Sequence, residues 1–169
     1  KKGQGKLICI ELASNMQKLI VYLNLNDLNE LFNILINEKC DLVRVKLVGT
    51  LLGLERVNDI SEYSTFIINA IERFSNDESW RVRFMLVKVM NEILQLINQM
   101  ENGKKVKEYI LKNYYQLLQD KEGEVRGMAC KILDAATEVL NEEEGFDKVL
   151  SYLKNLKNDN LAYVRRSLA

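Results

Sequence analysis

The stretch Asn76-Asp77-Glu78-Ser79-Trp80-Arg81-Val82-Arg83 contains a pattern that recurs along this chain of 169 residues. An amide and then an acidic residue come first, and a Val-Arg dipeptide begins five positions after the acidic residue. The valines of successive copies lie 39, 43 and 39 residues apart. Self-similarity at a period near forty indicates an array of structural repeats. The acidic residues and arginines of the four copies are Glu38 and Arg44, Asp77 and Arg83, Asp120 and Arg126, and Asp159 and Arg165.

Apolar residues keep the same register around each copy. They recur at helical spacing both before the acidic residue and after the valine, which marks one face of each of two helices. Before the acidic residue they are Leu28, Phe32 and Leu35; Ile67, Ile71 and Phe74; Ile110, Tyr114 and Leu117; and Val149, Leu153 and Leu156. After the valine they are Leu47, Leu51 and Leu54; Leu86, Val89 and Ile93; and Ala129, Ile132 and Ala136. Each unit is therefore predicted to be two helices joined by a turn of about four residues.

The expected fold is all-α, a right-handed α-solenoid of antiparallel helix pairs forming a single array. Short turns make neighbouring helices antiparallel, and one pair cannot bury its apolar face without stacking on the next pair. The absence of proline agrees with this fold. The predicted boundaries are a partial repeat over 1–24, repeats over about 25–58, 59–102 and 103–143, and a partial repeat over 144–169.

Composition restricts the function. The 24 basic residues balance the 24 acidic ones, which gives no electrostatic reason to expect nucleic acid or an anionic membrane as partner. The chain has no histidine, and its three cysteines form no Cys-x-x-Cys pair, so neither a metal site nor a cofactor is predicted. The expected compartment is the cytoplasm, with the nucleus as the alternative.

Catalysis is not expected from this sequence. Without histidine there is no imidazole for acid–base work and no Ser-His-Asp arrangement. The sequence also contains neither a Gly-x-x-x-x-Gly-Lys nor a Gly-x-Gly-x-x-Gly phosphate-binding motif. We therefore predict no catalytic residue and a binding role.

The repeated acidic residues and arginines are interpreted as structural. Each arginine lies six residues after an acidic residue, across the turn within its unit, and a carboxylate can accept hydrogen bonds from the guanidinium. Stacked units would align these pairs into a ladder. The ladder members are Glu38, Arg44, Asp77, Arg83, Asp120, Arg126, Asp159 and Arg165.

Trp80, unlike the ladder residues, is not repeated in the other copies, so the repeat does not require a large aromatic side chain at this position. The equivalent residues of the other copies are Asp41, Gly123 and Ala162, and Trp80 is expected to point away from the apolar face of its helix. Two interpretations stay open: an anchor for a protein partner, or packing over the preceding turn or a neighbouring repeat.

The window Asp77-Glu78-Ser79-Trp80-Arg81-Val82-Arg83-Phe84-Met85 resembles a turn in the middle repeats of the scaffold subunit of type-2A serine/threonine protein phosphatases. That family is built of HEAT repeats. The turns at Asp41-Leu42-Val43-Arg44, at 122–126 and at 164–169 are similar in the same order, so the resemblance spans nearly the whole chain.

The resemblance implies a non-catalytic scaffold that binds regulatory subunits through its within-repeat turns. The catalytic subunit of that family docks on later repeats, which this chain is not expected to contain. The partner-binding residues implied in this way are Asp41, Asp77, Trp80, Arg81, Glu122, Glu124 and Tyr163.

Two other binding roles are alternatives. A tubulin-binding TOG-type array would place Lys or Arg on most successive turns, whereas acidic residues are prominent here: Asp41, Glu78, Glu122 and Glu124. A nuclear-transport receptor fragment would usually lack the regular acidic and arginine pattern.

Overall fold

The computed structural model describes residues 2–100, 103–133 and 143–168, and within these ranges the secondary structure is helical with no β-strand. The α-helices are α1 (Lys2–Leu19), α2 (Leu25–Ile36), α3 (Asp41–Leu47), α4 (Ser64–Ser75), α5 (Trp80–Asn98), α6 (Lys104–Leu117), α7 (Gly123–Lys131), α9 (Glu143–Lys157) and α10 (Ala162–Arg166). Three 3₁₀ helices accompany them: η1 (Ile20–Tyr22), η2 (Val48–Arg56) and η3 (Ile60–Tyr63). The predicted all-α class is confirmed.

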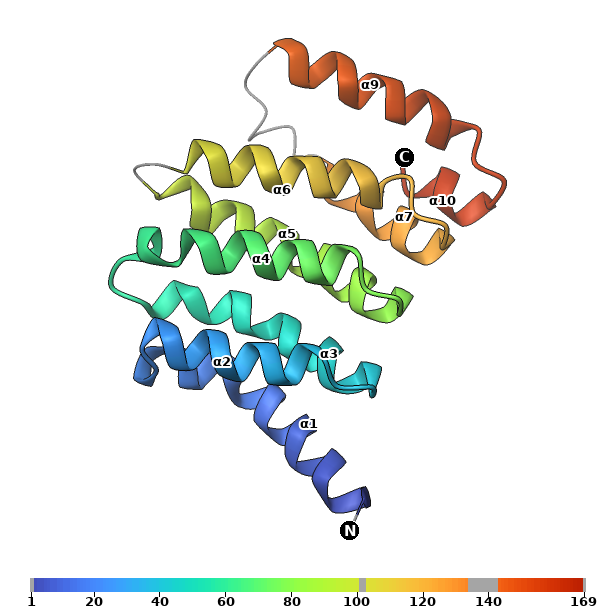
Figure 1. The fold of residues 1–169 in the computed structure, drawn as a ribbon. Coiled ribbons are helices and arrows are strands. Elements are labelled where there is room, and N and C mark those ends of the chain that lie inside the picture. Colours follow the sequence, from blue (N-terminus) through green and yellow to red (C-terminus); the bar gives the residue numbers. More distant parts are fainter. Residues whose placement is uncertain (1, 101–102, 134–142, 169) are drawn as a thin grey trace.

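The helices associate as pairs that lie one above another (Figure 1). Helix α2 packs on α3, α4 on α5, α6 on α7 and α9 on α10. The second helices of the pairs also contact one another in series, α3 with α5, α5 with α7 and α7 with α10. Helix α1 packs against α3 and η2 at the opposite end of this series. The predicted boundary at 102/103 adjoins residues 101–102, which lie outside the described residues, and the predicted boundary at 143/144 falls at the start of α9.

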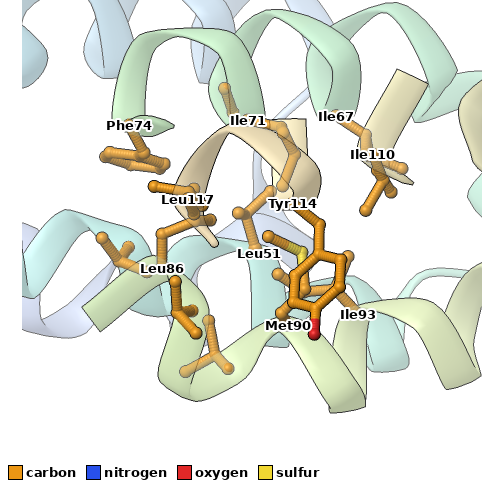
Figure 2. Packing of buried hydrophobic residues seen from close by; sticks show 14 of the residues in the cluster. Leu51, Ile67, Ile71, Phe74, Leu86, Met90, Ile93, Ile110, Tyr114 and Leu117 are labelled. Carbon is orange, nitrogen blue, oxygen red and sulfur yellow. The ribbon is translucent and has the colours of Figure 1, made fainter. Parts of the chain in front are cut away.

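The core consists of the residues at the predicted apolar positions. The four repeated valines, Val43, Val82, Val125 and Val164, are all fully buried. Figure 2 shows how Ile71 and Phe74 of α4, Leu86 of α5 and Leu117 of α6 meet between the pairs. Of the other predicted core residues, Ile132 and Leu153 are only partly buried, and Ala136 lies outside the described residues. Burial of these aliphatic side chains is the main stabilising contribution to the fold.

One segment departs from the expected α-helix. The helix expected to continue through Leu54 changes to 3₁₀ geometry after Leu47, although its predicted apolar residues are buried. Gly53 lies against α1 so closely that a Cβ atom there would be 2.5 Å from the backbone oxygen of Gln17. Glycine has low helix propensity and permits this close approach. Tertiary packing against α1 thus accompanies the local change of helix type.

Within the described residues, no helix is both long and apolar enough to cross a lipid bilayer.

Candidate protein-binding site

The turns within the helix pairs follow one another along one edge of the molecule (Figure 1). They comprise residues 37–40, 76–79, 118–122 and 158–161. At each turn the chain enters the second helix of a pair, so the first residues of α3, α5, α7 and α10 also lie along this edge. The edge, here called the turn edge, carries all the residues that the sequence implicated in partner binding.

Three arginines, Arg44 and Arg83, which are buried, and Arg126, which is partly buried, connect the successive turns. Arg44 donates hydrogen bonds from Nε and Nη2 to the two carboxylate oxygens of Asp77, at 2.7 and 2.9 Å. Its Nη1 donates to the backbone carbonyl of Glu38 at 2.6 Å. The same three bonds recur for Arg83 with Asp120 and the carbonyl of Asp77, and for Arg126 with Asp159 and the carbonyl of Asp120. Such bidentate, charge-assisted bonds are among the strongest in proteins.

The expected pairing of each arginine with the carboxylate of its own unit is wrong. Each of these arginines bonds to the carboxylate of the following unit and to the backbone carbonyl of the acidic residue in its own unit. The reason lies in the turn, where the aspartate also accepts the backbone N–H two residues later, as Asp77 does from Ser79 at 2.8 Å. This bond holds the carboxylate where the preceding unit's guanidinium reaches it.

The two ends of the ladder differ from its middle. Glu38 takes part through its carbonyl oxygen, and no described contact joins its carboxylate to an arginine. Arg165 donates Nη1 to the carbonyl of Asp159, as the other arginines do within their own units. The complete rungs in the described residues are therefore those between Arg44 and Asp77, Arg83 and Asp120, and Arg126 and Asp159.

The rungs shift the ionisation of their members. The hydrogen bonds that Arg44, Arg83 and Arg126 donate to Asp77, Asp120 and Asp159 raise the pKa of each arginine above its ordinary value. The Arg126 guanidinium in turn lowers the pKa of Asp159. The paired side chains are almost completely shielded from water, with 6% of each exposed in the pair between Arg44 and Asp77. Each of the three complete rungs is a salt bridge, with 2.6 or 2.7 Å between Nε and Oδ2.

Trp80 begins α5 at the centre of the turn edge and is partly buried. Its ring meets that of Phe84 edge-to-face, with 6.2 Å between centroids. The guanidinium carbon of Arg81 lies 5.0 Å from the Trp80 ring centroid, a cation–π distance. Trp80 packs on the core, as the second of the two interpretations expected, and its ring also supports the exposed Arg81 guanidinium. Its role as an anchor for a partner stays a prediction.

Asp41 joins this cluster from the neighbouring unit. Its Oδ2 accepts a hydrogen bond from Ser79 Oγ at 3.0 Å and lies 3.5 Å from Arg81 Nη1. The structure thus brings together three of the residues implicated in binding, Asp41, Trp80 and Arg81. Asp77 adjoins them through the hydrogen bond that it accepts from the Ser79 N–H. We call Asp41, Ser79, Trp80, Arg81 and Phe84 the Trp80 cluster.

The remaining implicated residues lie farther along the same edge. Tyr163 is 38% exposed and covers Gly123, where a Cβ atom would overlap the tyrosine ring. Partial desolvation and the adjacent Glu124 carboxylate raise the pKa of Tyr163. Glu122 is half-buried, and its backbone N–H donates to Asp120 at 2.9 Å. These residues belong to the next two turns and do not contact the Trp80 cluster in the described contacts.

Sequence reasoning missed three participants. Ser79 links two units through its hydroxyl, Glu78 adds a second carboxylate at 3.3 Å from Arg44, and Gly123 makes room for Tyr163. Gly123 had a detectable signal, since all three equivalent positions hold larger residues: Asp41, Trp80 and Ala162. Ser79 had none, because its partner lies 38 residues away.

The described residues contain no group of three His, Cys, Asp or Glu side chains placed to hold a metal ion. Burial raises the pKa of the Cys130 thiol to about 11, which makes it a poor nucleophile at neutral pH. The turn edge is thus a surface of charged and aromatic side chains on a shielded ladder.

The sequence matches no known protein-family model and no curated protein.

Proposed function

We propose that this chain is a HEAT-repeat scaffold that binds a regulatory subunit of a type-2A serine/threonine protein phosphatase through its turn edge. The observation that carries the proposal is the Trp80 cluster, in which an exposed cation lies over a partly buried aromatic ring. Trp, Tyr and Arg are the residues most often found at energetic centres of protein interfaces. The resemblance of the window around Trp80 to that scaffold family supplies the identity of the partner.

Support for a scaffold comes from the rigidity of the surface. The arginine rungs join turn to turn with bidentate bonds, so the side chains beside them have little freedom to rearrange. A surface held in place before binding loses less conformational entropy when a partner docks. The turn edge also extends over several helix pairs (Figure 1), which suits a partner that contacts successive turns.

The test is a binding measurement with purified regulatory subunits of the main type-2A classes, using this chain as the immobilised protein. We expect at least one class to bind, and Trp80→Ala to weaken binding about 30-fold, the loss typical of an interface hot spot. Tyr22→Ala is the matched control, because Tyr22 is an aromatic residue that is 83% exposed in η1, away from the turns within the helix pairs. Circular dichroism shows whether each variant is folded.

Failure of every regulatory class to bind would reject the phosphatase assignment. Binding of purified tubulin under the same conditions would favour the TOG-type alternative. Equal loss of binding in the Trp80 and Tyr22 variants would show that the interface is not centred on the turn edge.

A further inference from the structure

We infer that Asp41 is a positioning residue that holds Arg81 over the Trp80 ring, and that Arg81 receives an acidic side chain of the protein partner. The inference rests on the proposed function for the existence of a partner, and it assigns different roles to two residues that the resemblance treats alike. Asp41 acts across the boundary between two helix pairs, so the binding element is composed of two units.

The geometry of Asp41 supports a positioning role. Its side chain is 37% exposed, against 62% for Arg81, so the carboxylate is the more enclosed member of the pair. One oxygen, Oδ2, faces both the Ser79 hydroxyl at 3.0 Å and Arg81 Nη1 at 3.5 Å. The shorter bond to Ser79 ties Asp41 to the start of α5, which places the carboxylate beside the arginine.

Arg81 is held on two sides and open on the others. The Trp80 ring lies under the guanidinium at 5.0 Å, and the Phe84 ring packs edge-to-face against Trp80. A guanidinium has five N–H donors, and the described polar contact of Arg81 involves Nη1, at a distance longer than a strong hydrogen bond. Most of the donors therefore face solvent.

This arrangement selects the chemistry of the partner. A planar guanidinium with open donors matches a carboxylate, which it can bind in a bidentate manner. The ladder arginines differ in this respect, because Arg44 and Arg83 donate hydrogen bonds from the same groups to buried aspartates. Arg81 is the arginine beside Trp80 whose donors remain available to an acidic residue of a partner.

The positioning role can be tested without a partner, because Trp80 is the single tryptophan of the chain. Arg81→Ala uncovers the ring, and we expect acrylamide to quench its fluorescence more strongly. Asp41→Asn should raise quenching towards the Arg81→Ala level, whereas Glu92→Gln, which removes a similar exposed charge on α5, should match the wild type. Wild-type quenching in Asp41→Asn together with increased quenching in Arg81→Ala would overturn the positioning role.

The partner's chemistry is tested with the regulatory subunit that binds the wild-type chain most tightly. We expect Asp41→Asn to weaken binding about 5-fold, Arg81→Ala about 10-fold, and the double variant little more than Arg81→Ala, because both changes disable one element. Arg81→Glu should weaken binding more than Arg81→Ala. The inference would be overturned if the loss of affinity in the double variant equalled the product of the two single losses. It would also be overturned if Arg81→Glu bound more tightly than Arg81→Ala.

The two arms separate this inference from the proposed function. If no regulatory subunit binds, the proposed function and the acidic-partner assignment both fail, while the quenching comparison still decides whether Asp41 positions Arg81. If a subunit binds but the Arg81 variants bind equally well, the proposed function stands and the acidic-partner assignment fails.

Discussion

At the scale of single residues, neighbouring arginines of the same helix have opposite environments. Arg83 is buried and fully engaged with Asp120 and the carbonyl of Asp77. Arg81, two positions earlier, is largely exposed. Their separation by two residues places them on different faces of α5, so one arginine is buried in the ladder and the other is exposed on the turn edge, where our proposal places partner binding.

The first prediction follows from this contrast. Arg83→Ala leaves the Asp120 carboxylate buried without its cation, and removing one partner of a buried pair costs about 3–5 kcal/mol. We expect the free energy of unfolding to fall by about that amount in a urea titration followed by circular dichroism. Arg81→Ala is the control and should change stability little. An Arg83→Ala variant with wild-type stability would show that the ladder does not stabilise the fold.

A second prediction concerns acid stability. Arg126 lowers the pKa of Asp159 in the folded chain, below the unfolded value of about 3.9. The stabilisation is therefore fully present above pH 4 and is lost as pH falls through the folded pKa. We expect the difference in stability between the wild type and Asp159→Asn to shrink between pH 5 and pH 3. A difference that stays constant over this range would contradict the assignment.

At the scale of elements, the packing of η2 against α1 depends on a single glycine. Gly53 and Gly49 lie four residues apart in the same 3₁₀ helix, yet their surroundings differ. A Cβ atom at Gly53 would meet the Gln17 backbone at 2.5 Å and the Ile20 side chain at 2.8 Å. At Gly49 the nearest atom would be the flexible end of Gln17, at 3.9 Å.

We therefore expect Gly53→Ala to destabilise the protein by about 1–3 kcal/mol, because backbone atoms must shift to admit the methyl group. Gly49→Ala, which has room, should leave stability unchanged or raise it slightly. Thermal melting of the two variants side by side checks this difference. Similar melting temperatures for both would mean that α1 and η2 do not pack as closely as described.

At the scale of the whole molecule, the rungs share members. Asp77 accepts from Arg44 through its carboxylate and from Arg83 through its carbonyl, and Asp120 stands in the same relation to Arg83 and Arg126. Adjacent rungs are thus coupled through one residue, while the rungs of Arg44 and Arg126 have no residue in common.

A double-mutant cycle tests this coupling. The stability losses of Arg44→Ala and Arg83→Ala should be non-additive by about 0.5–3 kcal/mol, the range for residues in one network. Those of Arg44→Ala and Arg126→Ala should add within about 0.5 kcal/mol. Additivity in both cycles, measured by urea unfolding, would show that the rungs act independently.

Much of the molecule follows from the sequence alone. The helical spacing of residues such as Leu28, Phe32 and Leu35 identified which side chains are buried, because that spacing is dictated by backbone hydrogen bonds within a helix. The repeated pattern likewise identified the arginines of the ladder, Arg44, Arg83, Arg126 and Arg165. Such information is local, since each helix face is defined within a few turns of chain.

The tertiary structure alone decided which groups meet. Each ladder arginine bonds to an aspartate 33 or 37 residues away in the next unit, and Arg81 faces Asp41 of the preceding one. The distance and rotation between stacked pairs determine these partners, and both depend on how side chains of different units fill the space between them. Periodicity specifies the face of a helix, whereas packing specifies its neighbour.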